Sequence, residues 1–150
     1  NTGEEYWVFG DTPYLDSTSR SSDGNYDCIS GSALSKNILS VGAIEDLPWG
    51  YQNPADILMS SFSSWGPTDD GRIKPDLVAD GVAVFSTDNI SDNSYLTISG
   101  TSMASPSVAG SLALLQEYYS NLNNQPMKSS TLKALAIHTT KEAGPSPGPD

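Results

Sequence analysis

The stretch GTSMASP at residues 100–106 constrains this chain more than any other part of its sequence. Gly100 lets the backbone turn sharply and approach a neighbouring segment closely. The residues that follow are small and apolar, and they predict a helix from about Ser102 to about residue 119. The first N–H groups of a helix have no partner within it, and with the helix dipole they favour negative charge. Ser102 is therefore predicted to lie where the oxyanion formed by an attacking hydroxyl would be stabilised.

A simpler interpretation of the same residues is that Thr101 or Ser102 only caps the helix. Serine and threonine are common N-cap residues, because their side-chain oxygens accept hydrogen bonds from the free N–H groups of the first turn. The local chemistry alone leaves both interpretations open. The choice between them depends on the rest of the sequence.

Four short motifs occur in an order that resembles the subtilisin-like serine proteases, or subtilases. They are KNILSVGA at 36–43, FSSWGP at 62–67, KPDLVADGV at 74–82 and GTSMASP at 100–106. In that family the serine of the last motif is the catalytic nucleophile. The resemblance, which covers residues 37–139, therefore implies that Ser102 attacks peptide bonds in protein or peptide substrates.

The same resemblance implies roles for the neighbours of Ser102 and a place for the protein. We expect Gly100 and Thr101 to bind substrate beside the nucleophile, and Met103 to pack against it. Members of the family are mostly secreted, so the resemblance also implies a secreted serine endopeptidase, a hydrolase that acts in proteolysis.

Hydrophobic patterns and the family resemblance agree on an α/β fold. Residues 38–43 predict a buried strand of a parallel sheet. Residues 82–86 and 95–99 are further strand candidates, joined by a polar connection. A second helix is predicted from about residue 129 to 140. We expect part of a doubly wound parallel sheet in a three-layer α/β/α arrangement.

The chain divides into three parts by composition. Residues 1–35 are rich in small polar residues and predict a long surface loop, with a short strand at 6–9. Residues 37–140 hold the predicted core, and residues 144–150 form a segment rich in proline and glycine.

The order of catalytic groups in the family differs from what this chain contains. Subtilases carry their triad in the order Asp, His, Ser, but the one histidine here, His138, follows Ser102. His138 falls inside the second predicted helix, a poor position for a base that must reach an exposed serine. We therefore expect an upstream half of the catalytic domain to supply the Asp and His. This chain would then be the second half, inactive alone.

The oxyanion of acyl transfer needs a donor besides the N–H of the serine. In subtilases the donor is an asparagine upstream of the VGA strand, and the resemblance points to Asn1. An amide can donate a hydrogen bond without carrying charge. The alternative, that Asn1 has no role, stays open because the residues before it are not in the sequence.

Composition argues against several other kinds of protein. The chain holds 18 Asp and Glu against 7 Lys and Arg, a net charge of −11, which does not suit nucleic-acid binding. No apolar run reaches the length of a membrane helix. The single cysteine, Cys28, has no basic cluster beside it to activate the thiol. We expect that no cofactor is required. Calcium as a structural ion stays open, since Asp69, Asp70, Asp88 and Asp92 do not have EF-hand spacing.

Two other functions are weighed against the peptidase. An α/β-hydrolase esterase would require the pattern GxSxG, but residues 100–104 read GTSMA and lack the second glycine. A non-catalytic binding or structural module derived from a subtilase would lack intact Asp and His segments upstream.

Overall fold

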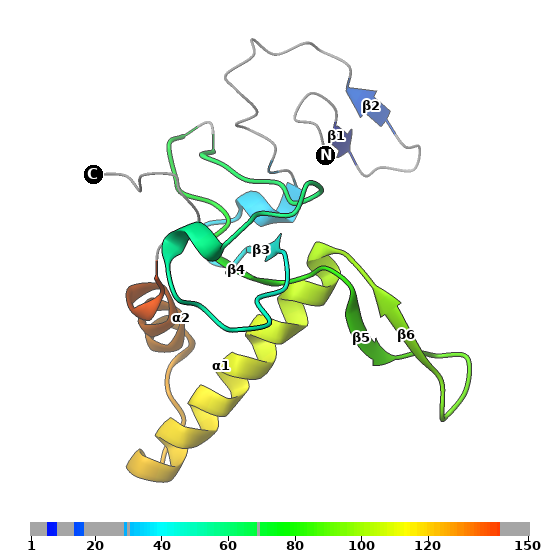
Figure 1. The fold of residues 1–150 in the computed structure, drawn as a ribbon. Helices are drawn as coiled ribbons and strands as arrows, with labels where there is room; N and C mark the ends of the chain where they lie inside the picture. Colours follow the sequence, from blue (N-terminus) through cyan, green and yellow to red (C-terminus); the bar gives the residue numbers. More distant parts are fainter. Residues whose placement is uncertain (1–5, 9–13, 17–28, 30, 69, 142–150) are drawn as a thin grey trace.

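A computed structural model describes residues 6–8, 14–16, 29, 31–68 and 70–141. In chain order its elements are β1 (Tyr6–Val8), β2 (Tyr14–Asp16), the 3-10 helix η1 (Gly31–Leu34), β3 (Val41–Ile44), the 3-10 helix η2 (Pro54–Asp56), β4 (Leu77–Asp80), β5 (Val84–Thr87), β6 (Tyr95–Ile98), α1 (Thr101–Asn123) and α2 (Ser129–Thr139). The long helix α1 passes beside β3 and β4, and the β5–β6 hairpin extends from near its N-terminal end (Figure 1).

The parallel pair β3–β4 forms the centre of the described fold. Val41 pairs with Leu77 and Ile44 pairs with Asp80, so the two strands match over their whole length. On its other side Ile44 forms an antiparallel bridge to Met59 in the loop that follows. The remaining strands form two antiparallel pairs, β1–β2 and β5–β6.

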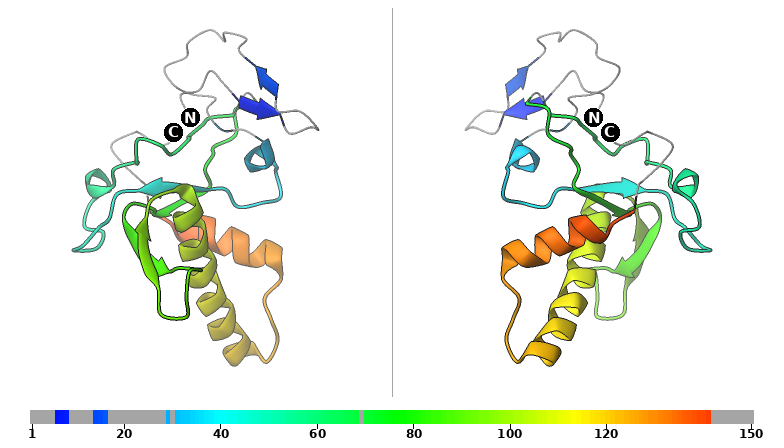
Figure 2. Two further views of the ribbon diagram at one scale, coloured as in Figure 1. Left: turned by 90° about the vertical axis from the view of Figure 1, so that its right-hand side faces the viewer. Right: turned by 90° about the vertical axis from the view of Figure 1, so that its left-hand side faces the viewer.

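Both helices lie on the same side of the β3–β4 pair (Figure 2). Helix α1 contacts both strands, and α2 packs against α1. Ala104, near the beginning of α1, is completely buried. Its small side chain lets the helix approach the sheet closely. The predicted α/β fold with parallel strands is confirmed.

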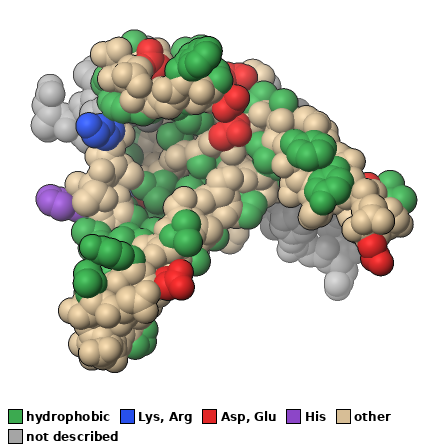
Figure 3. All heavy atoms as spheres, turned by 60° about the horizontal axis from the view of Figure 1, so that its bottom comes forward, with side chains coloured by type: hydrophobic (Ala, Val, Ile, Leu, Met, Phe, Trp, Pro, Cys, Tyr) green, Lys and Arg blue, Asp and Glu red, His purple; other side chains and the backbone are tan. Residues whose placement is uncertain are grey.

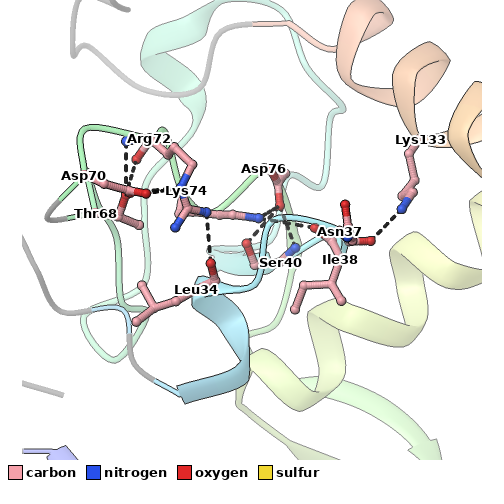
Figure 4. A network of polar contacts seen from close by, with 10 residues as sticks. All are labelled: Leu34, Asn37, Ile38, Ser40, Thr68, Asp70, Arg72, Lys74, Asp76 and Lys133. Carbon is pink, nitrogen blue, oxygen red and sulfur yellow. Dashed lines mark hydrogen bonds and ion pairs between the residues drawn. The ribbon is translucent and has the colours of Figure 1, made fainter.

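A partly buried ion pair ties the beginnings of the two parallel strands together (Figure 4). The Asp76 carboxylate, just before β4, accepts hydrogen bonds from the N–H and hydroxyl of Ser40, at 2.7 and 2.9 Å. It also accepts a bond of 2.6 Å from the Lys74 ammonium, whose side chain is only 4% exposed. Burial raises the pKa of Asp76, but the hydrogen bonds from Lys74 and Ser40 outweigh it and hold the pKa below its ordinary value.

A second polar cluster holds the loop that leads to this ion pair. The Asp70 carboxylate accepts bonds of 2.6 Å from the Thr68 hydroxyl and 2.9 Å from the Arg72 guanidinium. These two hydrogen bonds lower the pKa of Asp70 to about 2. Arg72 also donates to the carbonyl of Leu34 at 2.9 Å, which joins the loop to η1. The KPD motif and the loop before it therefore fix the amino ends of β3 and β4, which are the ends opposite Ser102.

The short motifs recognised in the sequence meet one another at glycines. A Cβ placed on Gly42 would lie 2.8 Å from Cγ of Pro75 and 3.1 Å from the hydroxyl of Ser63. That hydroxyl accepts a hydrogen bond of 3.0 Å from the N–H of Ala43. The VGA, FSSWGP and KPD motifs thus form one packed unit around β3, and a side chain at residue 42 would separate them.

Several element boundaries differ from those predicted. Strand β3 begins at Val41 rather than residue 38, because Ser40 is engaged by Asp76 and Ile38 lies exposed. Helix α1 continues to Asn123, past the predicted end at residue 119. The predicted hairpin is present, as are the predicted strand within residues 6–9 and an additional strand, β2. Residues 144–150 lie outside the described residues.

Candidate active site

Ser102 is the second residue of α1, directly after the turn at Gly100. Gly100 is the N-cap, Thr101 begins the helix, and no side chain caps it. Neither Thr101 nor Ser102 is therefore the capping residue, and the simpler interpretation of this segment is wrong. Ser102 is exposed, and no described residue forms a hydrogen bond with its hydroxyl.

The backbone of this turn is anchored to the carboxyl end of the parallel strands. The N–H of Gly100 donates to the carbonyl of Gly81, the residue after β4, at 2.8 Å. The N–H of Gly81 in turn donates to the carbonyl of Ile44, the last residue of β3, at 3.2 Å. Ser102 accordingly lies near the carboxyl ends of the parallel strands, where open α/β folds place their sites.

The electrostatics of the first turn of α1 favour an anion. The first turn contains no acidic residue, so no side chain of its own neutralises the positive end of the helix dipole. The N–H of Ser102 has no backbone acceptor among the described residues. One backbone donor and the helix dipole are thus available for a negative oxygen beside the Ser102 hydroxyl.

The other predicted site residues are not brought together by the described structure. His138 is exposed in the last turn of α2, rather than in the middle of the helix, and no described residue forms a hydrogen bond with its ring. Asn1, the predicted oxyanion donor, lies outside the described residues, as does Cys28. Met103, the residue after Ser102, is half-buried, and its packing against Ser102 stays a prediction.

No three His, Cys, Asp or Glu side chains in the described part of the chain are grouped so that they could hold a metal ion. Asp69 lies outside that part. Asp88 uses its carboxylate to accept the N–H of Asn89 at 2.7 Å, which is a local turn contact. A structural calcium ion stays a prediction. The described helices also include none with the length and apolar character that a membrane crossing requires.

Two residues of this region, Ser99 and Gly81, have contacts that no hydrophobic pattern in the sequence predicts. The hydroxyl of Ser99 accepts a hydrogen bond from the N–H of Ala83 at 2.9 Å. Gly81 lies in the motif at 74–82, but the motif does not indicate what it contacts. A Cβ on Gly81 would lie 2.9 Å from the carbonyl oxygen of Gly100. Both residues contact the turn before Ser102.

Comparison with known proteins places this geometry in a family. A family model described as the subtilase family matches residues 15–150. The C5a peptidase of Streptococcus pyogenes is 51% identical over 61 residues, which make up 41% of this chain and 5% of that protein. The PII-type proteinase of Lactococcus lactis subsp. cremoris is 50% identical over 66 residues, 44% of this chain and 3% of that protein. The chain thus spans only a small part of the length of these relatives.

A solved structure extends the likeness to the whole fold. The CspB protease of Clostridium perfringens matches this chain with a TM-score of 0.62 and 29% sequence identity. The match covers 88% of this chain and 28% of that one. The arrangement of strands and helices described above is therefore also found within a protease.

Proposed function

This chain belongs to the subtilase family, and we propose that it carries the nucleophile, Ser102, of a serine endopeptidase. The observation that carries this proposal is the placement of Ser102, which is exposed in the first turn of α1. No side chain caps that end of the helix. Thr101 and Gly100 flank it and would contact the substrate. The proposal concerns the activity of the whole protein rather than of these residues alone.

The chemistry follows from what a serine can do at this position. The Ser102 hydroxyl attacks the carbonyl carbon of a peptide bond, while its proton passes to a histidine base. Negative charge forms on the carbonyl oxygen, where the Ser102 N–H and the helix dipole stabilise it. The peptide C–N bond then breaks, the departing amine takes the proton, and an acyl-enzyme remains. A water molecule releases the acyl group by the same steps in reverse.

The base and its orienting aspartate come, on this proposal, from an upstream half of the catalytic domain. The exposed position of His138 at the end of α2 supports a source outside the described residues. Asn1 remains our proposed side-chain donor to the oxyanion. The protein is further proposed to act outside the cell, as the family resemblance implies, and its presence in the culture medium or on the cell surface tests this.

An exposed apolar face on α1 supports a covering partner within the same protein. Leu114, Tyr118 and Leu122 are four residues apart and between 65% and 69% exposed, so they form one face of the helix. Apolar side chains at the surface along α1 are visible in Figure 3. An apolar helix face of this kind normally packs against a core. We propose that the upstream half covers it. Leu114→Ala should then destabilise the full-length protein by about 3 kcal/mol, against under about 0.5 kcal/mol for a solvated face.

Mutation of Ser102 in the full-length protein tests the proposed function. Ser102→Ala should abolish cleavage of casein, because it removes the attacking oxygen. Ser111→Ala is the matched control, since Ser111 is an exposed serine further along α1 whose hydroxyl only bonds the carbonyl of Ser107. Equal activity of Ser102→Ala and the wild type would refute the role of Ser102. A wild-type protein without any peptidase activity would favour the non-catalytic module instead.

A further inference from the structure

The two residues before α1, Ser99 and Gly100, are both hydrogen bonded to one turn, residues 80–83. The Ser99 hydroxyl accepts the N–H of Ala83 at 2.9 Å, and the Gly100 N–H donates to the carbonyl of Gly81 at 2.8 Å. Val84 and Ile98 are the last pair of the β5–β6 hairpin. The Ser99 side chain therefore closes the base of the hairpin directly beyond its backbone pairing.

Ala83 adopts a backbone conformation that an alanine normally avoids. Its φ angle is 54°, in the left-handed region, which costs a residue with a side chain about 1–2 kcal/mol. The residue is exposed, so burial of its side chain does not hold it there. The hydrogen bond to Ser99 is a contact that favours this conformation. Backbone strain of this kind is characteristic of sites where geometry matters for function.

The turn at 80–83 is itself fixed to the sheet. The Asp80 carboxylate accepts the N–H of Val82 at 3.1 Å, and Gly81 is buried with its N–H bonded to the carbonyl of Ile44. A continuous set of contacts thus runs from β3 through the turn to Ser99 and Gly100. Ser102, the second residue of α1, follows only two residues after Gly100.

From these contacts we infer that Ser99 is a positioning residue for Ser102, an inference that rests on the proposed nucleophilic role of Ser102. Without the Ser99 hydroxyl, the chain leaving β6 is held to the turn by Gly100 alone, so the first turn of α1 is less closely fixed. A small displacement of a nucleophile slows attack strongly. The Ala83 N–H lies at the surface, where water replaces the lost acceptor, so the cost in stability is small.

Active-site titration of the full-length protein separates positioning from folding. A serine-directed phosphonylating reagent counts the competent sites, and kcat is then expressed per titrated site. Ser99→Ala should lower kcat per site by about 10- to 100-fold with KM for a short peptide unchanged. Ser99→Thr keeps a hydroxyl at this position and should restore most of the rate. Ser86→Ala is the control, because Ser86 is an exposed serine of β5 whose side chain has no hydrogen bond among the described residues.

Three outcomes would overturn the positioning role of Ser99, and a fourth would overturn the nucleophilic role of Ser102. An unchanged kcat per site in Ser99→Ala would overturn the positioning role, as would an equal loss in Ser86→Ala. A fall only in the number of titrated sites, together with a lower melting temperature, would show a purely structural role and would also overturn it. If the wild-type protein is not labelled at Ser102 at all, the proposed nucleophile is wrong, which the titration reveals before any variant is compared.

Discussion

At Gly81 three segments approach one another more closely than a methyl group would allow. A Cβ at this position would lie 2.6 Å from the Cβ of Ala43, 2.9 Å from the carbonyl oxygen of Gly100 and 3.3 Å from the Cβ of Ala104. These neighbours belong to β3, to the turn before Ser102 and to α1. The absence of a side chain at Gly81 therefore sets the distance between the nucleophile and the sheet.

A double-mutant cycle tests this contact. Gly81→Ala should destabilise the full-length protein by about 1–3 kcal/mol and lower kcat, because overpacking displaces Gly100. Adding Ala43→Gly removes the nearest clash but leaves the one with the Gly100 carbonyl. We expect the double variant to recover part of the stability and little of the activity, as measured by urea unfolding and peptide hydrolysis. Additive losses in both measurements would contradict the contact.

Asp76 makes the stability of the sheet depend on pH. Its pKa is lowered in the folded chain, so its stabilising effect is present above the unfolded value of about 3.9. It is lost as the pH falls through the lower folded value, because the carboxyl group is then protonated in both states.

Asp76→Asn should remove part of this pH dependence in the full-length protein. Near neutral pH it should cost about 3 kcal/mol, since it leaves the buried Lys74 ammonium without its counter-charge. Urea unfolding from pH 7 down to pH 2 measures both effects. Asp92→Asn, at an exposed turn, serves as the control. The role given to this ion pair is wrong if the two variants have the same free energy of unfolding and the same dependence of that free energy on pH.

Helix α1 shows how far an element could be predicted from its sequence. The glycine turn and the apolar spacing located its beginning to within one residue of Thr101. Its end was predicted too early, because residues 121–123 include two asparagines, which favour helices weakly. The helix stops instead at Asn124, the C-cap, whose φ of 53° and ψ of 25° are left-handed. Asparagine tolerates this conformation better than most residues.

Substitutions at Asn124 test this description of the helix end. Asn124→Gly should keep or slightly raise stability, because glycine adopts the left-handed region without steric cost. Asn124→Val should lower stability by about 1–2 kcal/mol, since its branched side chain is strained there. Thermal unfolding of the two variants compares them directly. A valine variant as stable as the glycine variant would mean that the helix does not end in this conformation.

For the whole molecule, local signals in the sequence predicted what depends on neighbours along the chain. They gave the fold class, the hairpin, both helices and the place of Ser102. Contacts between distant residues were not predictable in this way. The bonds from Ser40 to Asp76 and from Ala83 to Ser99 join residues 36 and 16 positions apart, and neither pair leaves a periodic pattern. These contacts fix the sheet and the turn before the nucleophile.

We expect the isolated 150-residue chain to have no peptidase activity, in contrast to the activity proposed for the whole protein. Ser102 needs a base, and the histidine of this chain is an exposed residue at the end of α2. Sensitive fluorogenic peptides, with heat-treated chain as the blank, measure any residual hydrolysis. Activity that disappears in both Ser102→Ala and His138→Ala would show that His138 is the base and that the chain is self-sufficient.

The most direct measurement of the central claim is to locate the reactive serine in the full-length enzyme. A phosphonylating reagent is reacted with the active protein, and the labelled peptide is mapped by mass spectrometry. The placement of Ser102 in the first turn of α1 predicts a single label on the peptide that contains residues 100–106, with loss of activity in proportion to labelling. A label on another serine, or an active enzyme that takes up no label, would contradict the assignment of Ser102 as the nucleophile.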